Sequence, residues 1–170
     1  MTVPEEFATA RLHAERLSES HHAELRVFHQ NAEMMALIGG LRDDAATQAY
    51  LERHLAQWRD FGFGFYLLRD ASTGAAVGTA GLRRLRLDGV DEVEVGYGFM
   101  PAYWGKGLGT EIAAACVQQA FGALDAPSVV ALTVPAHVAS QHVLTKVGLT
   151  FDRELIREER PMSLFRGTRQ

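Results

Sequence analysis

The sequence is poor in cysteine, with Cys116 alone in 170 residues. A single cysteine excludes an internal disulfide and any zinc site built from several thiolates. No apolar run approaches the roughly 20 residues of a membrane-spanning helix. The acidic N-terminus, residues 1–6, lacks the apolar segment of a signal peptide. We therefore expect a cytoplasmic protein that does not contact a membrane.

Positive charge is also scarce. Seventeen Lys and Arg residues stand against 21 Asp and Glu residues, which gives a formal net charge of −4 at pH 7. A mildly acidic chain without a basic block is a poor non-specific binder of nucleic acid, so none is expected as a partner. The pair His21-His22 has no third ligand at metal spacing, and no metal is expected. Length and composition predict one globular domain over residues 1–170.

The first part of the chain changes from helical to strand periodicity near Gly62. After a strand at Thr9–Leu17, a helix is expected from the N-cap Ser18 to about His29. A second helix is expected at Asp44–Phe61, because apolar residues recur there at helical spacing. An antiparallel meander follows, with strands expected at Phe63–Arg69, Val77–Leu87 and Val90–Met100.

The second part alternates helices and strands. Helices are expected at Leu108–Gly122 and Ala139–Val147, and strands at Ser128–Val134, Thr150–Arg157 and Pro161–Arg166. The strand at 128–134 is almost wholly apolar, which indicates a buried central position. The order β-α-α-β-β-β-α-β-α-β-β predicts an α+β domain. Its central sheet is expected to be mixed, mostly antiparallel, twisted and flanked by helices.

A glycine-rich loop, Trp104-Gly105-Lys106-Gly107-Leu108-Gly109-Thr110, joins a strand to a helix. Alternate glycines permit positive φ angles and a close ligand, and the amides and dipole of the helix start favour an anion. Phosphate is the natural ligand. Neither a Walker A loop nor a dinucleotide fingerprint fits, because Gly107 follows Lys106 and Thr110 replaces a required glycine. The alternative interpretation is a tight turn that binds nothing.

The strand before the loop supports a ligand. Alternation places Glu94, Gly96 and Gly98 on one face and thereby leaves a gap beside a carboxylate. Glycine within a strand often marks a bulge or a closely approaching ligand. Tyr97 and Phe99 lie on the opposite face and are predicted to be core residues.

These segments resemble the GNAT superfamily, and within it the RimJ/RimL-like N-acetyltransferases. Residues 93–97 (Val-Glu-Val-Gly-Tyr) and 101–111 are similar to the strand and acetyl-CoA loop of that family. In its motif Q/R-x-x-G-x-G/A, Trp104 takes the first position, as in the RimJ-like branch, and Gly107 and Gly109 match. Residues 134–140 and 143–149 resemble the N-x-x-S segment and the helix after it, although His137 replaces the usual Asn.

The resemblance implies a GNAT-like domain with acetyl-CoA as cosubstrate. The pyrophosphate is expected on the amides of residues 105–110. The pantetheine is expected along a strand end that splays from the strand at 128–134. The implied cofactor-binding residues are Phe99, Met100, Trp104, Gly105, Lys106, Gly107, Leu108, Gly109, Thr110, His137 and Ser140. A homodimer is expected by the same analogy.

Acetyl transfer to an amine needs a base for the amine proton and a donor for the oxyanion, and the leaving thiolate takes up a proton. By resemblance, Glu94 is the candidate base, acting through water, and Ser140 is placed to contact the sulfur or an ordered water. The alternative for Ser140 is a hydrogen bond that starts the helix. The alternative is that Glu94 joins Asp88, Asp91 and Glu92 in an acidic patch that attracts a cationic amine. The tyrosine that many GNAT members use as leaving-group acid is absent, since Leu144 stands in its place.

The predicted activity is acetyl-CoA-dependent N-acetylation of a primary amine, either a protein N-terminus or a small amine. Direct attack on the thioester is preferred to an acyl-enzyme, because Cys116 has apolar neighbours in the expected helix. The alternative is a non-catalytic acyl-CoA-binding module, which the departure at His137 and the missing tyrosine keep open. A nucleotide-binding enzyme is a third possibility.

Overall fold

One mixed sheet organises the protein in the computed structural model, which describes residues 1–169. Its eight strands follow the spatial order β1-β2-β3-β4-β5-β6-β8-β7. The strands are β1 (Glu6–Ala8), β2 (Leu12–Arg16), β3 (Phe65–Asp70), β4 (Ala76–Leu87), β5 (Val90–Phe99), β6 (Ser128–Thr133), β7 (Thr150–Arg157) and β8 (Arg160–Thr168). Within residues 1–169, β5 and β6 form the one parallel pair. The predicted fold class, an α+β domain on a mixed, mostly antiparallel sheet, is confirmed.

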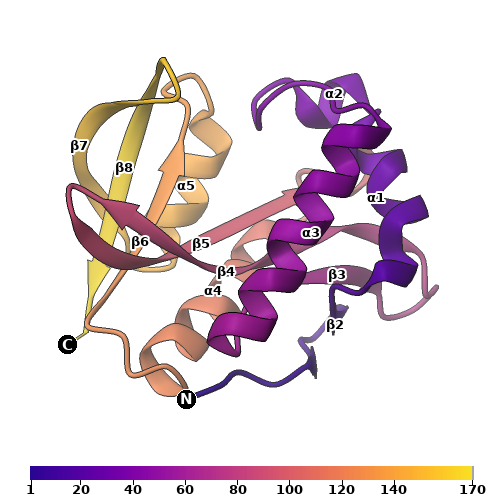
Figure 1. The fold of residues 1–170 in the computed structure, drawn as a ribbon, viewed down its shortest axis with the longest axis horizontal. Helices are drawn as coiled ribbons and strands as arrows, with labels where there is room; N and C mark the ends of the chain where they lie inside the picture. Colours follow the sequence, from indigo (N-terminus) through magenta and orange to yellow (C-terminus); the bar gives the residue numbers. More distant parts are fainter. Residues whose placement is uncertain (170) are drawn as a thin grey trace.

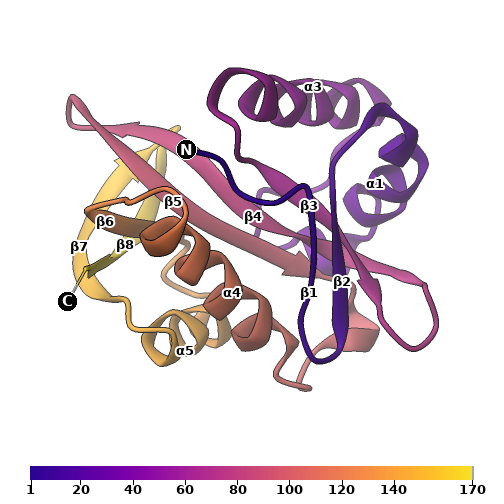
Figure 2. The ribbon, with the colours of Figure 1, turned by 90° about the horizontal axis from the view of Figure 1, so that it is seen from below.

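Helices cover both faces of the sheet (Figures 1 and 2). They are α1 (His22–His29), α2 (Ala32–Met35), α3 (Asp44–Phe61), α4 (Leu108–Gly122) and α5 (Val138–Lys146). Helices α1 and α3 lie on one face, and α4 and α5 lie on the other (Figure 2). In the described part of the chain, no helix is both long and apolar enough to cross a membrane.

Two short elements were not expected from the sequence, the three-residue strand β1 and the four-residue helix α2. Pairing with β2 fixes β1, and the side chain of Asn31 accepts from the Met34 amide to start α2. The predicted first strand is shorter than expected, because the Thr9 amide bonds to the Leu12 carbonyl in the β1–β2 turn. Such tertiary and turn contacts leave little trace in the hydrophobic periodicity of the sequence.

Helix α3 has the predicted bounds because both of its ends carry strong local signals. The Asp43 side chain accepts from the Ala46 amide at 2.8 Å at the start. At the end Gly62 adopts φ 73° and donates to the Trp58 carbonyl. The indole of Trp58 then donates to the Phe65 carbonyl at 2.9 Å, which ties the buried helix face to β3.

The core is divided by the sheet. The larger cluster includes Ile112, Cys116 and Leu144 of α4 and α5, and the second includes Leu25 and Leu51 of α1 and α3. Cys116 is fully buried, as predicted, and burial raises the pKa of its thiol to about 12. A thiol of this kind is inert as a nucleophile at neutral pH.

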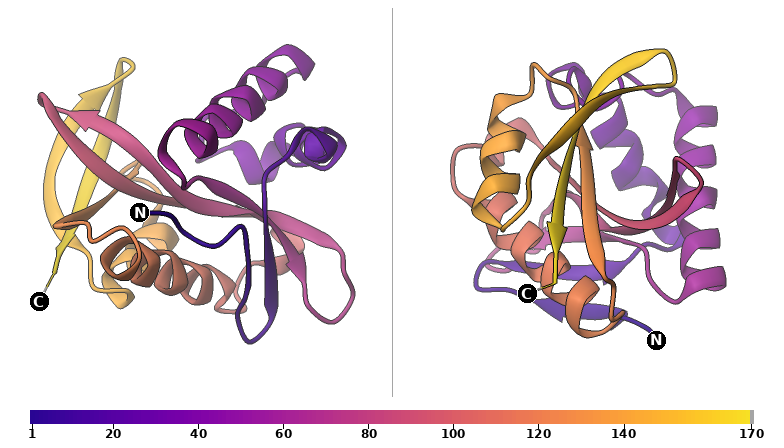
Figure 3. Two further views of the ribbon diagram at one scale, coloured as in Figure 1. Left: turned by 60° about the horizontal axis from the view of Figure 1, so that its bottom comes forward. Right: turned by 90° about the vertical axis from the view of Figure 1, so that its left-hand side faces the viewer.

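Strands β5 and β6 stay together for only part of their length (Figure 3). Their register pairs Val93 with Val129 and Glu94 with Val130, and no further pair follows within residues 1–169. Strand β5 nevertheless continues to Phe99 and β6 to Thr133. The splay expected from the resemblance is confirmed. Beyond the two paired positions, the backbone groups of β5 and β6 do not hydrogen-bond to one another.

Candidate functional site

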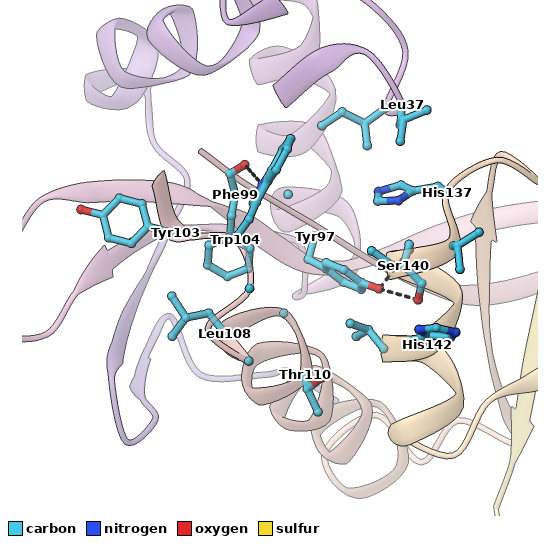
Figure 4. A pocket seen from close by; sticks show the side chains of 18 of the residues that line it. Leu37, Tyr97, Phe99, Tyr103, Trp104, Leu108, Thr110, His137, Ser140 and His142 are labelled. Carbon is cyan, nitrogen blue, oxygen red and sulfur yellow. Dashed lines mark hydrogen bonds between the residues drawn. The ribbon is translucent and has the colours of Figure 1, made fainter. Parts of the chain in front are cut away.

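A cavity of about 660 Å³ opens beside the splayed strands (Figure 4). This volume is in the range of small-molecule sites. Its walls come from the α2 segment, the end of β5, the glycine-rich loop and α5. Of the implied cofactor residues, the lining includes Phe99, Trp104, Gly105, Gly107, Leu108, Gly109, Thr110, His137 and Ser140. The fold therefore gathers nine of these eleven residues around one space.

The glycine-rich loop presents backbone amides at the start of α4. Gly105 and Gly107 have φ angles of 71° and 79°, in the left-handed region that favours glycine. The first hydrogen bond of the helix runs from the Glu111 amide to the Gly107 carbonyl at 3.1 Å. The amides of residues 108–110 precede this ladder and lie at the positive end of the helix dipole. The arrangement suits a phosphate group.

A contact with the β1–β2 turn holds this loop in place. Arg11 donates from Nη1 to the Lys106 carbonyl at 2.7 Å and from Nε to Glu111 at 2.9 Å. Thr9 donates to the same carboxylate at 2.6 Å. Burial acts to raise the pKa of Glu111, but the hydrogen bonds from Thr9 and Arg11 lower it below the ordinary value. Arg11 thus offsets a negative charge that would otherwise oppose an anion at the loop.

Two of the predicted cofactor residues lie outside the cavity lining. Both backbone groups of Met100 serve the fold, since its amide donates to Val77 and its carbonyl accepts from Tyr103. The Met100 amide is thus already engaged within the fold, and contact between Met100 and pantetheine stays a prediction. Lys106 turns its ammonium over the Tyr103 ring, 5.4 Å from the centroid, and not into the cavity.

Phe99 keeps one backbone group for a ligand. Its carbonyl accepts from the indole of Trp104 at 2.8 Å. Its neighbour Met100 bonds back to β4, so strand alternation turns the Phe99 amide toward the splayed side. This N–H fits an amide-bearing chain such as pantetheine. Phe99 is one of the cofactor-binding residues that the resemblance implies.

Tyr97 lies in the cavity although the sequence pattern placed it in the core (Figure 4). Its hydroxyl is 3.0 Å from the Ser140 Oγ and donates to the Ser140 carbonyl at 3.2 Å. Burial raises the pKa of the phenol to about 12. His137 lines the same space, and burial lowers its pKa. Strand alternation in the sequence placed Tyr97 on the face of the strand opposite Glu94. No local sequence pattern indicated that α5 would bring Ser140 next to Tyr97.

Glu94 lies on the other face of β5, on the side of the sheet that α1 and α3 cover (Figure 2). It is only 4% exposed, and its carboxylate accepts from the Nε of Arg83, the residue directly opposite on β4. It is not part of the cavity lining. On the same face, Gly98 adjoins Ile38 and Met34, which do line the cavity. The face that bears Glu94 therefore leads to the cavity.

The acidic patch that was the alternative role for Glu94 does not form. Asp88 pairs with Arg153, and Asp91 pairs with Arg84 and Arg86. Glu92 is buried against Arg166, with its carboxylate 2.7 Å from Nη1. Each carboxylate is offset by an arginine, two of them from strands late in the chain, so this surface does not attract a cationic amine in the expected way.

Comparison with known proteins finds relatives over most of the chain. The family model described as "Acetyltransferase (GNAT) domain" matches residues 11–150. An uncharacterized protein of Bacillus subtilis, YkkB, is 24% identical over 133 residues, which cover 78% of this chain and 77% of its own. A crystal structure of an acetyltransferase from Agrobacterium tumefaciens superposes with a TM-score of 0.86 at 25% identity, covering 99% of this chain and 96% of the other.

The match over most of the chain shows that the protein belongs to the GNAT acetyltransferase family. RimL, a ribosomal L7/L12 α-N-protein acetyltransferase solved with coenzyme A, superposes with a TM-score of 0.80 at 13% identity. The alignment covers 96% of this chain and 98% of RimL. At that identity the likeness shows the fold alone. Within residues 1–169, no group of three or more His, Cys, Asp or Glu is arranged to hold a metal ion.

Proposed function

We propose that this protein transfers the acetyl group of acetyl-CoA to a primary amine, in the manner of the RimJ/RimL-like enzymes. The proposal depends on the free backbone amides at the start of α4. These amides border the cavity beside the splayed strands. A diphosphate binds at such a helix start without further charged groups. The pantetheine would run along the splay and bond to the Phe99 amide.

Transfer proceeds by direct attack of the neutral amine on the thioester carbonyl. The C–N bond forms, the C–S bond breaks, the nitrogen loses a proton and the sulfur gains one. We assign Glu94 as the base that takes the proton from the nitrogen. It takes this proton through a water molecule, or directly after its carboxylate gives up the contact with Arg83 for one with the amine. This assignment is consistent with the buried carboxylate on the face that leads to the cavity.

The proton for the sulfur is assigned to Tyr97. A phenol with a pKa of about 12 stays protonated at neutral pH and is available as a donor. The Ser140 Oγ lies 3.0 Å from the Tyr97 hydroxyl and positions that hydroxyl within the cavity. This assignment replaces the tyrosine that the sequence lacks at position 144 with one from a strand.

The rival function is a module that binds acyl-CoA without turning it over. The two are separated by incubating the protein with acetyl-CoA and a broad panel of amines while free CoA thiol is measured. We expect thiol release that depends on the amine and an acetylated amine found by mass spectrometry. Calorimetric binding of acetyl-CoA with no amine-dependent release would favour the module.

Replacing Tyr97 with phenylalanine is expected to lower kcat roughly tenfold or more, because the donor to the leaving thiolate is lost. The KM for acetyl-CoA should change by less than about twofold, since the ring and its packing remain. Steady-state kinetics measure both quantities, and thermal unfolding of the variant checks its fold. An unchanged kcat would remove Tyr97 from the reaction.

A further inference from the structure

Positive side chains gather on the α3 side of the sheet, beside the candidate base. We call Arg42, Arg53, Arg83 and Arg160 the arginine cluster. The charges of Arg53, Arg83 and Arg160 all act on Arg42. These residues come from the segment before α3, from α3, from β4 and from the start of β8. The cluster thus forms only in the folded chain.

The carboxylates near the cluster act on one of its arginines, Arg83. Glu94 pairs with Arg83, and the charge of Glu158 also acts on Arg83. Within residues 1–169, no carboxylate lies within 4.0 Å of a side-chain nitrogen of Arg42, Arg53 or Arg160. By contrast, Asp88, Asp91 and Glu92 each pair with an arginine.

Arg42 is the half-buried member of the cluster without an acid. Its guanidinium lies 5.1 Å from the centroid of the Tyr50 ring, and Nη1 is 3.9 Å from the sulfur of Met35. Burial lowers its pKa, and the other arginines add to that effect. Stacking on Tyr50 accounts for the position of the side chain. It supplies no anion for a desolvated cation, which is costly to leave unpaired.

The two histidines beside the cluster do not alter its charge balance at neutral pH. Burial lowers the pKa of His29 to about 4 and that of His54 to about 3, with contributions from Arg42 and Arg53. Both rings are therefore neutral at pH 7. The field at this place comes from the arginines, with Glu94 and Glu158 as the opposing charges.

The cluster adjoins the path from Glu94 to the cavity. Arg83 contacts Glu94 directly. The segment from Met34 to Arg42 begins at the cavity wall, and its end is fixed by the Arg42 amide, which donates to the His29 carbonyl at 3.1 Å. An amine poised near Glu94 would place the rest of its molecule against the cluster.

We propose that the acceptor amine also carries a carboxylate, which Arg42 binds with support from Arg53 and Arg83. This inference rests on the proposed function. A guanidinium fork matches a carboxylate in geometry and charge, and binding would give Arg42 the anion that the fold does not provide. Amino acids and short peptides with a free C-terminus meet this description. Polyamines do not, because the cluster would repel them.

The test compares amines that differ only in the anion. Wild-type protein is assayed with each amino acid and a set of dipeptides, and with the corresponding C-terminal amides, at fixed acetyl-CoA. We expect kcat/KM to favour the free acid over its amide by about tenfold or more, the size of a charge-assisted hydrogen bond. The amide has the less basic amine, so amine reactivity alone works against this result.

The variant Arg42→Gln should raise the KM for the free acid by about tenfold while it leaves the KM for the amide and for acetyl-CoA within about twofold. Arg59→Gln is the matched control, because Arg59 is an exposed arginine of α3 that pairs with its neighbour Asp60. It should change neither constant. If Arg42→Gln does not fold, Arg53→Gln on the exposed face of α3 should show the same selective rise.

Failure of this inference differs from failure of the proposed function. Turnover that is equal or better with amides or polyamines overturns the carboxylate site and leaves acetyl transfer intact. A preference for phosphoethanolamine over the amino acids overturns the carboxylate in favour of a phosphate. The absence of any amine-dependent thiol release, with acetyl-CoA still bound, overturns both proposals.

Discussion

Replacing Glu94 with glutamine is expected to lower kcat by about a hundredfold, the usual scale for the loss of a general base. The substitution keeps the size of the side chain but removes its ability to accept a proton and its charge toward Arg83. The KM for acetyl-CoA should be little changed, because Glu94 lies on the face opposite Tyr97 and outside the cavity lining. Thiol release at saturating amine measures the effect.

Glu92 provides the matched control for this variant. It lies two residues earlier on β5, is similarly buried and pairs with an arginine, Arg166. Glu92→Gln should lower the thermal midpoint in the same way as Glu94→Gln and leave turnover largely intact. Equal losses of turnover in the two variants would mean that Glu94 only supports the fold. Unaltered turnover of Glu94→Gln across the pH range would exclude it as the base.

Replacing Gly107 with valine is expected to weaken acetyl-CoA binding by about tenfold to a hundredfold. The φ angle of 79° at this position costs a β-branched residue roughly 1–3 kcal/mol. Relief of that strain would rotate the peptide units that begin α4 and disperse the amides proposed to hold the phosphates. Isothermal titration calorimetry with acetyl-CoA measures the dissociation constant.

Two further glycine variants distinguish strain at the loop from a general loss of stability. Gly122→Val lies at the end of the same helix, where an added Cβ meets nothing within 4 Å, so binding should be unchanged. Gly107→Asn should retain more affinity than the valine variant, because asparagine tolerates the left-handed region. Normal affinity in Gly107→Val would show that the phosphates bind elsewhere.

The parts of the protein that local sequence determines were predicted well. Helices α3 and α4 have the expected bounds, since caps and glycines define helix ends. The glycine-rich loop proposed to bind phosphate was also identifiable, because its glycines and the helix start are consecutive in the chain. The strand meander followed from a change of period and from turn residues such as Asp88-Gly89.

The features that depend on distant contacts were missed or misread. The environment of Glu94 is set by Arg83 across a strand pair, and that of Glu92 by Arg166, 74 residues away. An acidic run therefore looked like an attractive patch although the fold neutralises it. Tyr97 was taken for a core residue because alternation gives its face but not the gap that the splay opens there.

The bond from Arg11 to the Lys106 carbonyl, with Thr9 and Arg11 on Glu111, has a practical consequence for handling the protein. The rigidity of the glycine-rich loop depends on residues near the beginning of the chain, about a hundred positions away. Proteolytic trimming or a bulky fusion partner that disturbs β1 would alter the proposed coenzyme site without contacting it. Material altered at that end would report a misleadingly low coenzyme affinity.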